Sequence, residues 1–409
     1  MFKQFVTVSF ILISFTGLVF AGETNPKPNI VIFLVDDPGS ADFGFQGTKR
    51  VKTPNIDRLA HNGVRFTNAY TTGCVCSPTR AGLMTGRYQQ RFGFDANAEG
   101  KASGDKNVRA LDIAQTTTAQ RFKALGYATA IFGKWHLGAG EEYLPQARGF
   151  DEFAGVLPHG LAAKEPDGSP AKFYRGTTVI PRPENPMEEY AREATSFIDR
   201  NRSKPFFLYL PFTHVHGPHV GTPQYLDTLD EDIPLNQRKY LADLLETDAV
   251  IGKIMDSLRE KGLEENTLVF FLGDNGGPGG AADNGQLRGT KWYLWEGGIR
   301  VPFAVYWKGH IQGGQVSDHP VISLDIIRTA LTAAGATIDP AWKLDGADLW
   351  PLLQGQSDAA PHDALYWRFG SQYAVRKGDW KLIKPHIDKE PQLYNLAADV
   401  GEQTDLAEQ

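Results

Sequence analysis

The chain has 409 residues, with 42 Lys and Arg against 48 Asp and Glu, so its formal net charge is −6. A hydrophobic content of 41% with 22% charged residues excludes a disordered or low-complexity chain, and the length is sufficient for a large domain with a smaller one. The negative balance argues against nucleic-acid binding, which needs clustered Lys and Arg. The two cysteines, Cys74 and Cys76, are too few for a disulfide framework and too closely spaced for a good bridge between them.

The N-terminal segment is typical of a secretory signal peptide. Lys3 gives a positive start, the stretch 5–20 is almost unbroken in apolar character, and Ala21 lies where a signal peptidase would cleave. The apolar stretch is shorter than a typical membrane span, so we favour cleavage over a retained anchor. We therefore expect residues 1–21 to be removed from an exported protein, periplasmic or secreted, without a stable membrane anchor.

Strands and helices alternate through most of the chain. This pattern predicts an α/β domain over residues 22–340, with a large, mostly parallel or mixed sheet flanked by helices. Ligands bind beyond the carboxyl ends of the strands in such sheets. The expected strands are 28–35, 64–70, 127–132, 206–210 and 267–272, and the expected helices are 55–62, 78–86, 118–125, 187–202 and 235–261.

The pattern changes near residue 340. Short strands separated by tight turn signals predict a small antiparallel sheet, which we assign to a C-terminal α+β subdomain over 341–409. These strands are expected at 364–369, 372–376, 379–384 and 392–395.

The segment 76–87, Cys-Ser-Pro-Thr-Arg-Ala-Gly-Leu-Met-Thr-Gly-Arg, has the strongest chemical character. Pro78 fits the first turn of a helix, which places Cys76 at or just before the helix N-terminus. Backbone N–H groups there are expected to lower the pKa of the Cys76 thiol and to attract an anion, and Arg80 follows one turn later. We interpret Cys74 as a buried structural residue, because no partners at metal-ligand spacing accompany the Cys-x-Cys pair.

Oxygen donors follow two of the predicted strands. Asp36 and Asp37 end the first strand, and Asp274 and Asn275 end the strand at 267–272. Four hard oxygen ligands without Cys or His favour Ca²⁺ over Zn²⁺.

Basic residues follow two further strands. Lys134 and His136 come directly after 127–132 and project to the same side of an extended segment. The strand at 206–210 is followed by three histidines, which suggest zinc, but no carboxylate spacing completes a zinc site. These histidines are His214, His216 and His219.

The 76–87 segment resembles the signature of type I sulfatases, the formylglycine-dependent sulfatases of the alkaline phosphatase superfamily. Every fixed position of Cys-x-Pro-[Ser/Thr]-Arg followed by Leu-x-Thr-Gly-Arg matches. The resemblance implies an alkaline-phosphatase-like fold and oxidation of Cys76 to formylglycine by a formylglycine-generating or anaerobic sulfatase-maturating enzyme. It further implies that Arg80 stabilises the modified side chain and the sulfate, and that one Ca²⁺ ion is held by Asp36, Asp37, Asp274 and Asn275.

The same resemblance implies roles for the remaining basic residues. Lys134 and His136 match the family's Gly-Lys-x-His, with Lys134 binding sulfate and His136 contacting the formylglycine. Lys291 matches the lysine of Lys-x₄-Glu-Gly-Gly-[Ile/Val]-Arg-x-Pro and becomes the second sulfate-binding lysine. The family's His-x-Pro selects His216 over His214 as the acid that protonates the departing alcohol. Hydrolysis of a sulfate monoester follows from these roles.

Two further segments, 86–93 and 366–370, resemble the branch near N-acetylgalactosamine-6-sulfatases and bacterial sulfatases of algal polysaccharides. This implies a galactose-type sulfated carbohydrate such as carrageenan as substrate. Two alternatives stay open: a phosphomonoesterase or phosphodiesterase of the same superfamily, and a non-catalytic carbohydrate-binding relative. The candidates for sugar contacts are His159, Arg175, His214 and Arg368.

Overall fold

A computed structural model describes residues 1, 27–98, 110–157 and 171–409, and a ten-stranded sheet lies at their centre. Most of the predicted signal peptide and the candidate His159 fall outside the described residues. The strands of the central sheet are β1 (Asn29–Val35), β2 (Val64–Phe66), β4 (Ala128–Lys134), β5 (Glu152–Val156), β6 (Phe173–Arg175), β7 (Thr178–Ile180), β8 (Phe206–Pro211), β9 (Thr267–Gly273), β10 (Phe303–Tyr306) and β11 (Gln315–Ser317).

The strand order is β11-β2-β10-β9-β1-β8-β4-β5-β6-β7. The middle of the sheet is parallel, because β1 pairs in parallel with β8 and β9, and β4 pairs in parallel with β8 and β5. Antiparallel pairs appear toward both edges, at β9–β10–β2 and at β5–β6–β7. Every residue of β1, β4, β8 and β9 is buried, which explains why these strands read as continuous apolar runs in the sequence.

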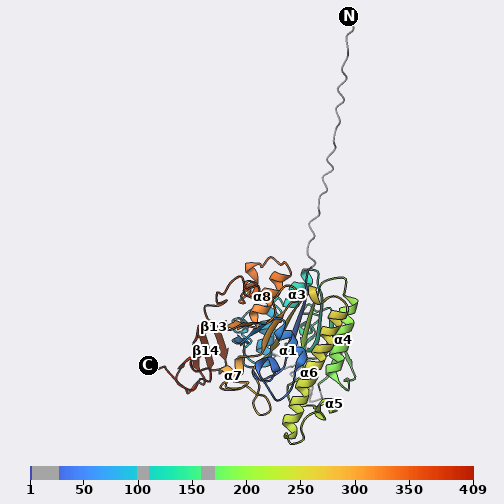
Figure 1. Cartoon of the computed structure of the whole chain (residues 1–409). Helices are drawn as coiled ribbons and strands as arrows, with labels where there is room; N and C mark the ends of the chain where they lie inside the picture. Colours follow the sequence, from blue (N-terminus) through green and yellow to red (C-terminus); the bar gives the residue numbers. More distant parts are fainter. Residues whose placement is uncertain (2–26, 99–109, 158–170) are drawn as a thin grey trace.

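Helices cover both faces of this sheet (Figure 1). One core cluster joins alternate residues of β1 to α1, α4 and α6, and a second joins the other residues of β1 to α2, α3 and α8. The helices are α1 (Pro54–His61), α2 (Cys76–Thr85), α3 (Thr118–Ala124), α4 (Pro186–Arg200), α5 (Pro223–Leu226), α6 (Leu235–Glu260), α7 (Glu296–Ile299), α8 (Leu324–Ala333) and α9 (Trp350–Leu353). Short 3₁₀ helices are η1 (Gly44–Gln46), η2 (Gln89–Phe92), η3 (Glu141–Tyr143), η4 (Glu264–Asn266) and η5 (Pro340–Trp342).

The predicted α/β class is confirmed, and two local expectations need correction. The single strand expected at 64–70 is two strands, since β2 lies in the central sheet whereas β3 (Ala69–Tyr70) pairs with β12 (Val321–Ile322). The break allows Tyr70 to leave the central sheet and pack against Trp367. The sequence reading also omitted β5, β10 and α8, whose apolar residues belong to the two core clusters.

The predicted small antiparallel sheet is present near the C-terminus (Figure 1). Its inner face, including Trp367 and Tyr394, shares a buried cluster with Tyr70 and Leu294 of the preceding chain. The placement of a domain boundary at residues 340 and 341 stays a prediction. The strands are β13 (Leu365–Phe369), β14 (Gln372–Lys377), β15 (Trp380–Lys384) and β16 (Gln392–Asn395). No helix within the described ranges is both long and apolar enough to cross a membrane.

Candidate active site

The carboxyl edge of the parallel strands carries the candidate residues. β1 and β9 pair in register, with Val35 opposite Gly273, so the polar residues that follow the two strands are neighbours. The backbone confirms this contact, because the N–H of Asp274 donates to the carbonyl of Val35 at 3.0 Å. On the other side of β1, the N–H of Asp36 donates to the carbonyl of His214 at 2.9 Å. The topology thus brings together groups from four distant parts of the chain.

Each acidic side chain of this edge is paired with a cation. Lys134, the last residue of β4, donates from Nζ to Oδ2 of Asp36 at 2.6 Å. Lys291 donates from Nζ to Oδ2 of Asp37 at 2.6 Å. Burial by itself would raise the pKa of Asp36, but the surrounding cations, with Lys134 foremost, outweigh it and hold that pKa well below its usual range. Asp36 is therefore an ionised carboxylate within a buried site.

Arg80 joins the signature helix to the acidic edge. It is fully buried, and its Nε and Nη2 both donate to Oδ2 of Asp274, at 3.1 and 2.8 Å. Its Nη1 donates to the backbone carbonyl of Lys134 at 2.9 Å. Burial and the negative charge of Asp36 raise the pKa of Asp274 to about 6, although the positive charge of Arg80 acts to lower it. The guanidinium is fixed at the centre of the site by these bonds.

Cys76 begins α2, as the sequence predicted, and its thiol faces the acidic residues. Its Sγ lies 3.3 Å from Oδ1 of Asp36 and 3.8 Å from Oδ1 of Asp37. The expectation of a lowered thiol pKa is wrong: burial first, and then the charges of Asp274 and Asp36, raise the pKa of Cys76 well above its usual value. A neutral, buried thiol is a poor nucleophile.

Two histidines border this cluster. His136 is buried, and the Oγ of Ser77, next to Cys76, donates to its backbone carbonyl at 2.8 Å. Its φ of 58° is unusual for a non-glycine residue and turns the chain directly after Lys134 and Trp135. His216 lies with Nε2 3.6 Å from Oδ2 of Asp37. Burial lowers the pKa of His216, which makes its protonated ring a stronger acid.

His214 occupies a different position from the one expected of a sugar contact. The residue is 4% exposed, and its Nε2 lies 3.0 Å from Oε2 of Glu246 and 3.7 Å from Oδ1 of Asp243. Burial would lower the pKa of His214, but the hydrogen bond to Glu246 and the nearby carboxylates raise it. The ring of His214 thus faces α6 and anchors the loop that carries His216, and its sugar contact stays a prediction that these contacts do not support.

The carboxylates of Asp243 and Glu246 were missed by the sequence reading. Both are buried in α6, on the side of the helix that also carries the buried Tyr240 and Val250. Acidic residues on the apolar side of a helix are the signal that could have revealed them, since buried carboxylates are rarely left without partners. Here the partners are His214 and the loop, because Asp243 accepts the N–H of Gly221 at 2.9 Å.

The acidic edge has the donor chemistry of a hard-cation site. Ligand atoms of Asp36, Asp37, Cys76 and Asp274 all lie within 4.8 Å of one another. The buried Oδ1 of Asn275 has no hydrogen-bond partner among the described residues, while its Nδ2 donates to Asp37 at 2.8 Å. An unsatisfied buried oxygen beside three carboxylates fits an oxygen-coordinated cation such as Ca²⁺.

The remaining sugar-contact candidates lie apart from this cluster. Arg368 in β13 pairs with Asp95 at 2.7 Å and contacts the carbonyl of Gln90, at the end of the segment that follows α2. Arg175 is half-exposed and pairs with Glu189 at 2.5 Å. Of these two candidates, Arg368 contacts the segment that follows the signature helix, and Arg175 pairs with a residue of α4.

Comparison with protein families explains this arrangement. Residues 28–336 match the family described as Sulfatase, and residues 289–409 match the family described as N-sulphoglucosamine sulphohydrolase, C-terminal. The chain belongs to the sulfatase family. It is a type I sulfatase of the alkaline phosphatase superfamily, and hence a sulfuric ester hydrolase.

Individual sulfatases resemble the chain over most of its length. Arylsulfatase G of Rattus norvegicus is 30% identical, covering 98% of this chain and 88% of that protein. N-acetylgalactosamine-6-sulfatase of Mus musculus is 33% identical, covering 91% of this chain and 74% of that protein. The crystal structure of Ps i-CgsB in complex with k-i-k-neocarrahexaose superposes with a TM-score of 0.86 at 30% identity, covering 93% of this chain and 89% of that one. The PsFucS1 sulfatase from Pseudoalteromonas sp. superposes with a TM-score of 0.80 at 27% identity, covering 93% and 86%.

Proposed function

We propose that this sulfatase is exported and hydrolyses sulfate monoesters on a carbohydrate, with a galactose-type sugar of a polysaccharide such as carrageenan as the favoured substrate. The observation that carries the proposal is the position of Cys76 against Asp36 and Asp37, within a buried cluster that also holds Arg80. Structural cysteines usually pack among apolar side chains, whereas the thiol of Cys76 faces two carboxylates.

Two groups complete the proposed site. Formylglycine, formed from Cys76 by a maturating enzyme, would supply in its hydrated form the hydroxyl that attacks sulfur. Ca²⁺, held by Asp36, Asp37, Asp274 and Asn275, would supply Lewis-acid polarisation. The three carboxylates are balanced by Arg80, Lys134 and Lys291, so a bound divalent cation leaves the site positive and suited to an anionic sulfate ester.

The chain's own cations bind and orient the ester. Lys134 and Lys291 bind the sulfate oxygens, and Arg80 stabilises the charge that grows on them during the reaction. Their positions are set before substrate arrives, because each is already held by a carboxylate at 2.6–2.8 Å. Such preorganisation lowers the cost of rearranging charges as the reaction proceeds.

Two histidines carry protons in this scheme. His216 protonates the oxygen of the departing sugar alcohol, and His136 accepts the proton from the hydroxyl that remains at position 76. The positions support a division of labour, because His136 is fully buried beside α2 whereas the side chain of His216 keeps 21% exposure. The exposed ring is the one that an entering sugar can reach.

The carbohydrate class is supported by relatives rather than by a bound ligand. The relatives include an N-acetylgalactosamine-6-sulfatase and a protein crystallised with k-i-k-neocarrahexaose. Arg368, beside the signature segment, remains the proposed sugar contact, together with His159. The sulfated position on the sugar is the property that substrate screening must supply.

The proposal is tested in two measurements on protein from an exported preparation. Mass spectrometry of the peptide that contains Cys76 should find the mass of formylglycine, whereas the peptide mass at Cys74 should be that of a thiol or its alkylated form. Wild-type protein should then release sulfate from defined galactan oligosaccharides. An unmodified Cys76 in fully active protein, or activity toward aryl phosphate that exceeds activity toward aryl sulfate, would overturn the proposal.

A further inference from the structure

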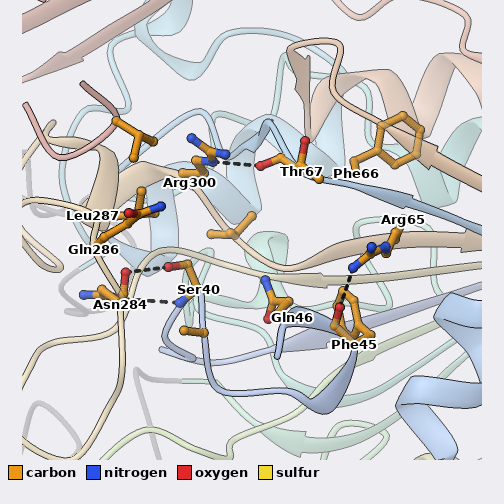
Figure 2. A pocket seen from close by; sticks show the side chains of 14 residues that line it. Ser40, Phe45, Gln46, Arg65, Phe66, Thr67, Asn284, Gln286, Leu287 and Arg300 are labelled. Atoms are coloured by element: carbon orange, nitrogen blue, oxygen red, sulfur yellow. Dashed lines mark hydrogen bonds between the residues drawn. The ribbon is translucent and has the colours of Figure 1, made fainter. Parts of the chain in front are cut away.

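A pocket opens at the edge of the central sheet that also carries the proposed reaction centre. Its volume is about 410 Å³, within the range of small-ligand sites (Figure 2). Five parts of the chain form it: the segment after β1, the strand β2 with its following residue, the loop between β9 and α7, the residues before β10, and Val400 after β16. The side chains that matter below are Ser40, Gln46, Arg65, Asn284, Gln286 and Arg300.

The topology places this pocket at the same edge of the sheet as the reaction centre. β2 is antiparallel to β10, which is antiparallel to β9, so β2 and β9 point their carboxyl ends to the same side. In the strand order β2-β10-β9-β1, three steps separate β2 from β1, which corresponds to roughly 14 Å. The pocket therefore lies a short distance from Asp36 and Asp37, along the same edge.

One loop serves both sites. It begins at Asn275, carries Lys291, and between them supplies Asn284 and Gln286 to the pocket. Asn284 fixes the loop, because its Nδ2 donates to the carbonyl of Gly277 at 3.0 Å and its Oδ1 accepts the N–H of Gly277 at 3.1 Å. The carbonyl of Asn284 also accepts the hydroxyl of Ser40 at 2.9 Å. Reaction centre and pocket are thus built on one rigid segment.

The charge of the pocket lining is positive. Arg65 and Arg300 are its ionisable side chains, and none of its fourteen lining residues is acidic. Figure 2 shows that both guanidiniums are oriented by backbone carbonyls: Arg65 donates to Phe45 and Arg300 donates to Thr67, each at 2.8 Å. A carbonyl orients a guanidinium without neutralising it, so a positive field remains in the pocket.

One carboxylate lies near Arg300, but it is shared. Oε2 of Glu296 lies 3.4 Å from Nη1 of Arg300, while Oε1 of the same residue pairs with the buried Lys381 at 3.0 Å. Lys381 also pairs with Glu402 at 2.9 Å, and Arg376 lies near Glu296 as a third cation, so two carboxylates face three cations. Arg65 has no acidic partner within 4.0 Å among the described residues, and its Nη1 donates to the carbonyl of Phe45.

The polar lining adds acceptors and donors that suit sugar hydroxyls. The buried Oε1 of Gln46 has no hydrogen-bond partner in the part of the chain that the structure describes. Gln46 lines the pocket next to Arg65 (Figure 2). The side-chain amide of Gln46 offers a hydrogen bond to a ligand hydroxyl, and the guanidinium of Arg65 offers a cation for a sulfate group.

From this combination we propose that the pocket is an accessory subsite for a second sulfated sugar unit of the glycan chain that is being hydrolysed at the reaction centre. The inference rests on the proposed function, because it assumes a carbohydrate substrate that carries more than one sulfate. Arg65 and Arg300 bind the sulfate group of that unit, and the amides of Gln46 and Gln286 contact its hydroxyls. The subsite gives longer sulfated chains a higher affinity than short ones.

The first experiment measures binding by calorimetry in a Cys76→Ala background, so that no turnover occurs during the titration. A carrageenan hexasaccharide, the disaccharide of the same repeat and inorganic sulfate are the three probes. Arg65→Gln should raise the Kd for the hexasaccharide about tenfold, because it removes a charge-assisted contact. The Kd of the disaccharide, which fills only the reaction centre, should change less than twofold, and Arg65→Lys should restore part of the hexasaccharide affinity. Arg259→Gln, at the far end of α6, is the matched control and should leave all Kd values unchanged.

The second experiment compares two substitutions of opposite charge at one exposed position, where neither is expected to disturb folding. Gln286 is exposed on the loop, so Gln286→Glu and Gln286→Lys should both fold. The hexasaccharide Kd should rise severalfold with Glu and fall with Lys, and the difference should shrink at high salt because the effect is electrostatic. Equal Kd values for the two variants would overturn the subsite.

The outcomes separate the subsite from the proposed function. Loss of hexasaccharide binding in Arg65→Gln upholds the subsite even if wild-type protein releases no sulfate, which would count against the proposed function alone. Sulfate release with equal affinity for hexasaccharide and disaccharide upholds the function and overturns the subsite. Binding of inorganic sulfate in the pocket without any gain for the hexasaccharide also overturns it, because the pocket would then hold a small anion only.

Discussion

Two buried charge clusters lie at opposite sides of the loop 275–300, and they differ in what is left after their charges have paired. Around Glu296 each carboxylate has a cation: Lys381 contacts Glu296 at 3.0 Å and Glu402 at 2.9 Å, and the hydroxyl of Tyr70 donates to Glu296 at 2.6 Å. This cluster joins β15 of the small sheet to the central domain. The ion pairs of this cluster therefore have a structural role, which is to connect two parts of the chain.

In the cluster at the carboxyl edge of β1 the charges are also paired, but two other groups are not satisfied by their surroundings. The Oδ1 of Asn275 has no hydrogen-bond partner among the described residues, and the thiol of Cys76 is directed at carboxylates that oppose its ionisation. Burial and ion pairing are common to both clusters. The unsatisfied oxygen and the unfavourably placed thiol are what distinguish a site for chemistry from a structural joint.

The largest expected effect comes from removing the Cys76 side chain. Cys76→Ala should reduce sulfate release by more than roughly a thousandfold, because it deletes the proposed precursor of the nucleophile. Cys74→Ala is the matched control: it also removes a buried thiol two residues away, costs about 1 kcal/mol of stability and keeps activity within a fewfold. Comparable activity of the two variants in a sulfate-release assay would contradict the proposed role of Cys76, and with it the assignment of its cluster as the site of chemistry.

The second prediction concerns the cation. Ca²⁺ at a hundred times its Kd should stabilise the wild-type protein by about 2.7 kcal/mol in thermal or denaturant unfolding, and chelation should remove this gain. Asp274→Asn should abolish most of the Ca²⁺-dependent gain and reduce activity by about a hundredfold, since it removes a charged ligand and the partner of Arg80.

The control for this prediction lies in the other buried acidic group of the sheet edge. Asp243, His214 and Glu246 also lie close enough together to hold an ion, but their oxygens are engaged with the loop at 220–222. Asp243→Asn should therefore lower stability and keep the Ca²⁺-dependent gain. Loss of that gain in Asp243→Asn but not in Asp274→Asn would place the cation at Asp243 and contradict the proposed Ca²⁺ site.

A third prediction tests the structural joint. Lys381→Met should destabilise the protein by about 3–5 kcal/mol in urea unfolding, because it leaves the carboxylates of Glu296 and Glu402 buried without their cation. The folded fraction should keep its sulfatase kcat, since Lys381 does not touch the reaction centre. Lys377→Met, on the exposed side of the same sheet, should change stability by no more than about 0.5 kcal/mol. A selective loss of kcat in folded Lys381→Met protein would contradict the assignment of this cluster as structural.

The smallest effect is expected at a half-buried pair near the small sheet. His362 lies 2.7 Å from Oδ1 of the buried Asp325; burial would lower its pKa, but the hydrogen bond and charge of Asp325 raise it. The His362–Asp325 pair therefore stabilises the folded chain fully at pH values below the pKa of His362 in the unfolded chain, which is near 6.5. This contribution is lost as the pH rises through the higher pKa of His362 in the folded chain.

His362→Asn should accordingly cost about 1 kcal/mol at pH 5.5 and less at pH 9, as measured by urea unfolding at the two values. His319→Asn is the control, because its partner Asp358 is fully exposed. A larger loss at pH 9 than at pH 5.5 for His362→Asn would show that the sign of the shift is wrong.

Much of the fold was legible in the sequence because the central strands are buried on both faces. β1, β8 and β9 read as continuous apolar runs and were placed within one or two residues. Strands such as β5 and β10 were missed, since they are short and their pairing depends on partners far along the chain. The division of 64–70 into β2 and β3 was missed for the same reason.

The sequence alone determined the family and the local chemistry. Its signature segment placed Cys76 and Arg80 on one helix turn, and its strand ends placed acidic pairs at an edge, because both patterns are short-range consequences of chain geometry. The tertiary structure decided the environment. It raised the pKa of Cys76 instead of lowering it, turned His214 toward α6 and placed Arg65 and Arg300 in the lining of one pocket, because burial and the approach of charges depend on segments that meet only in the folded chain.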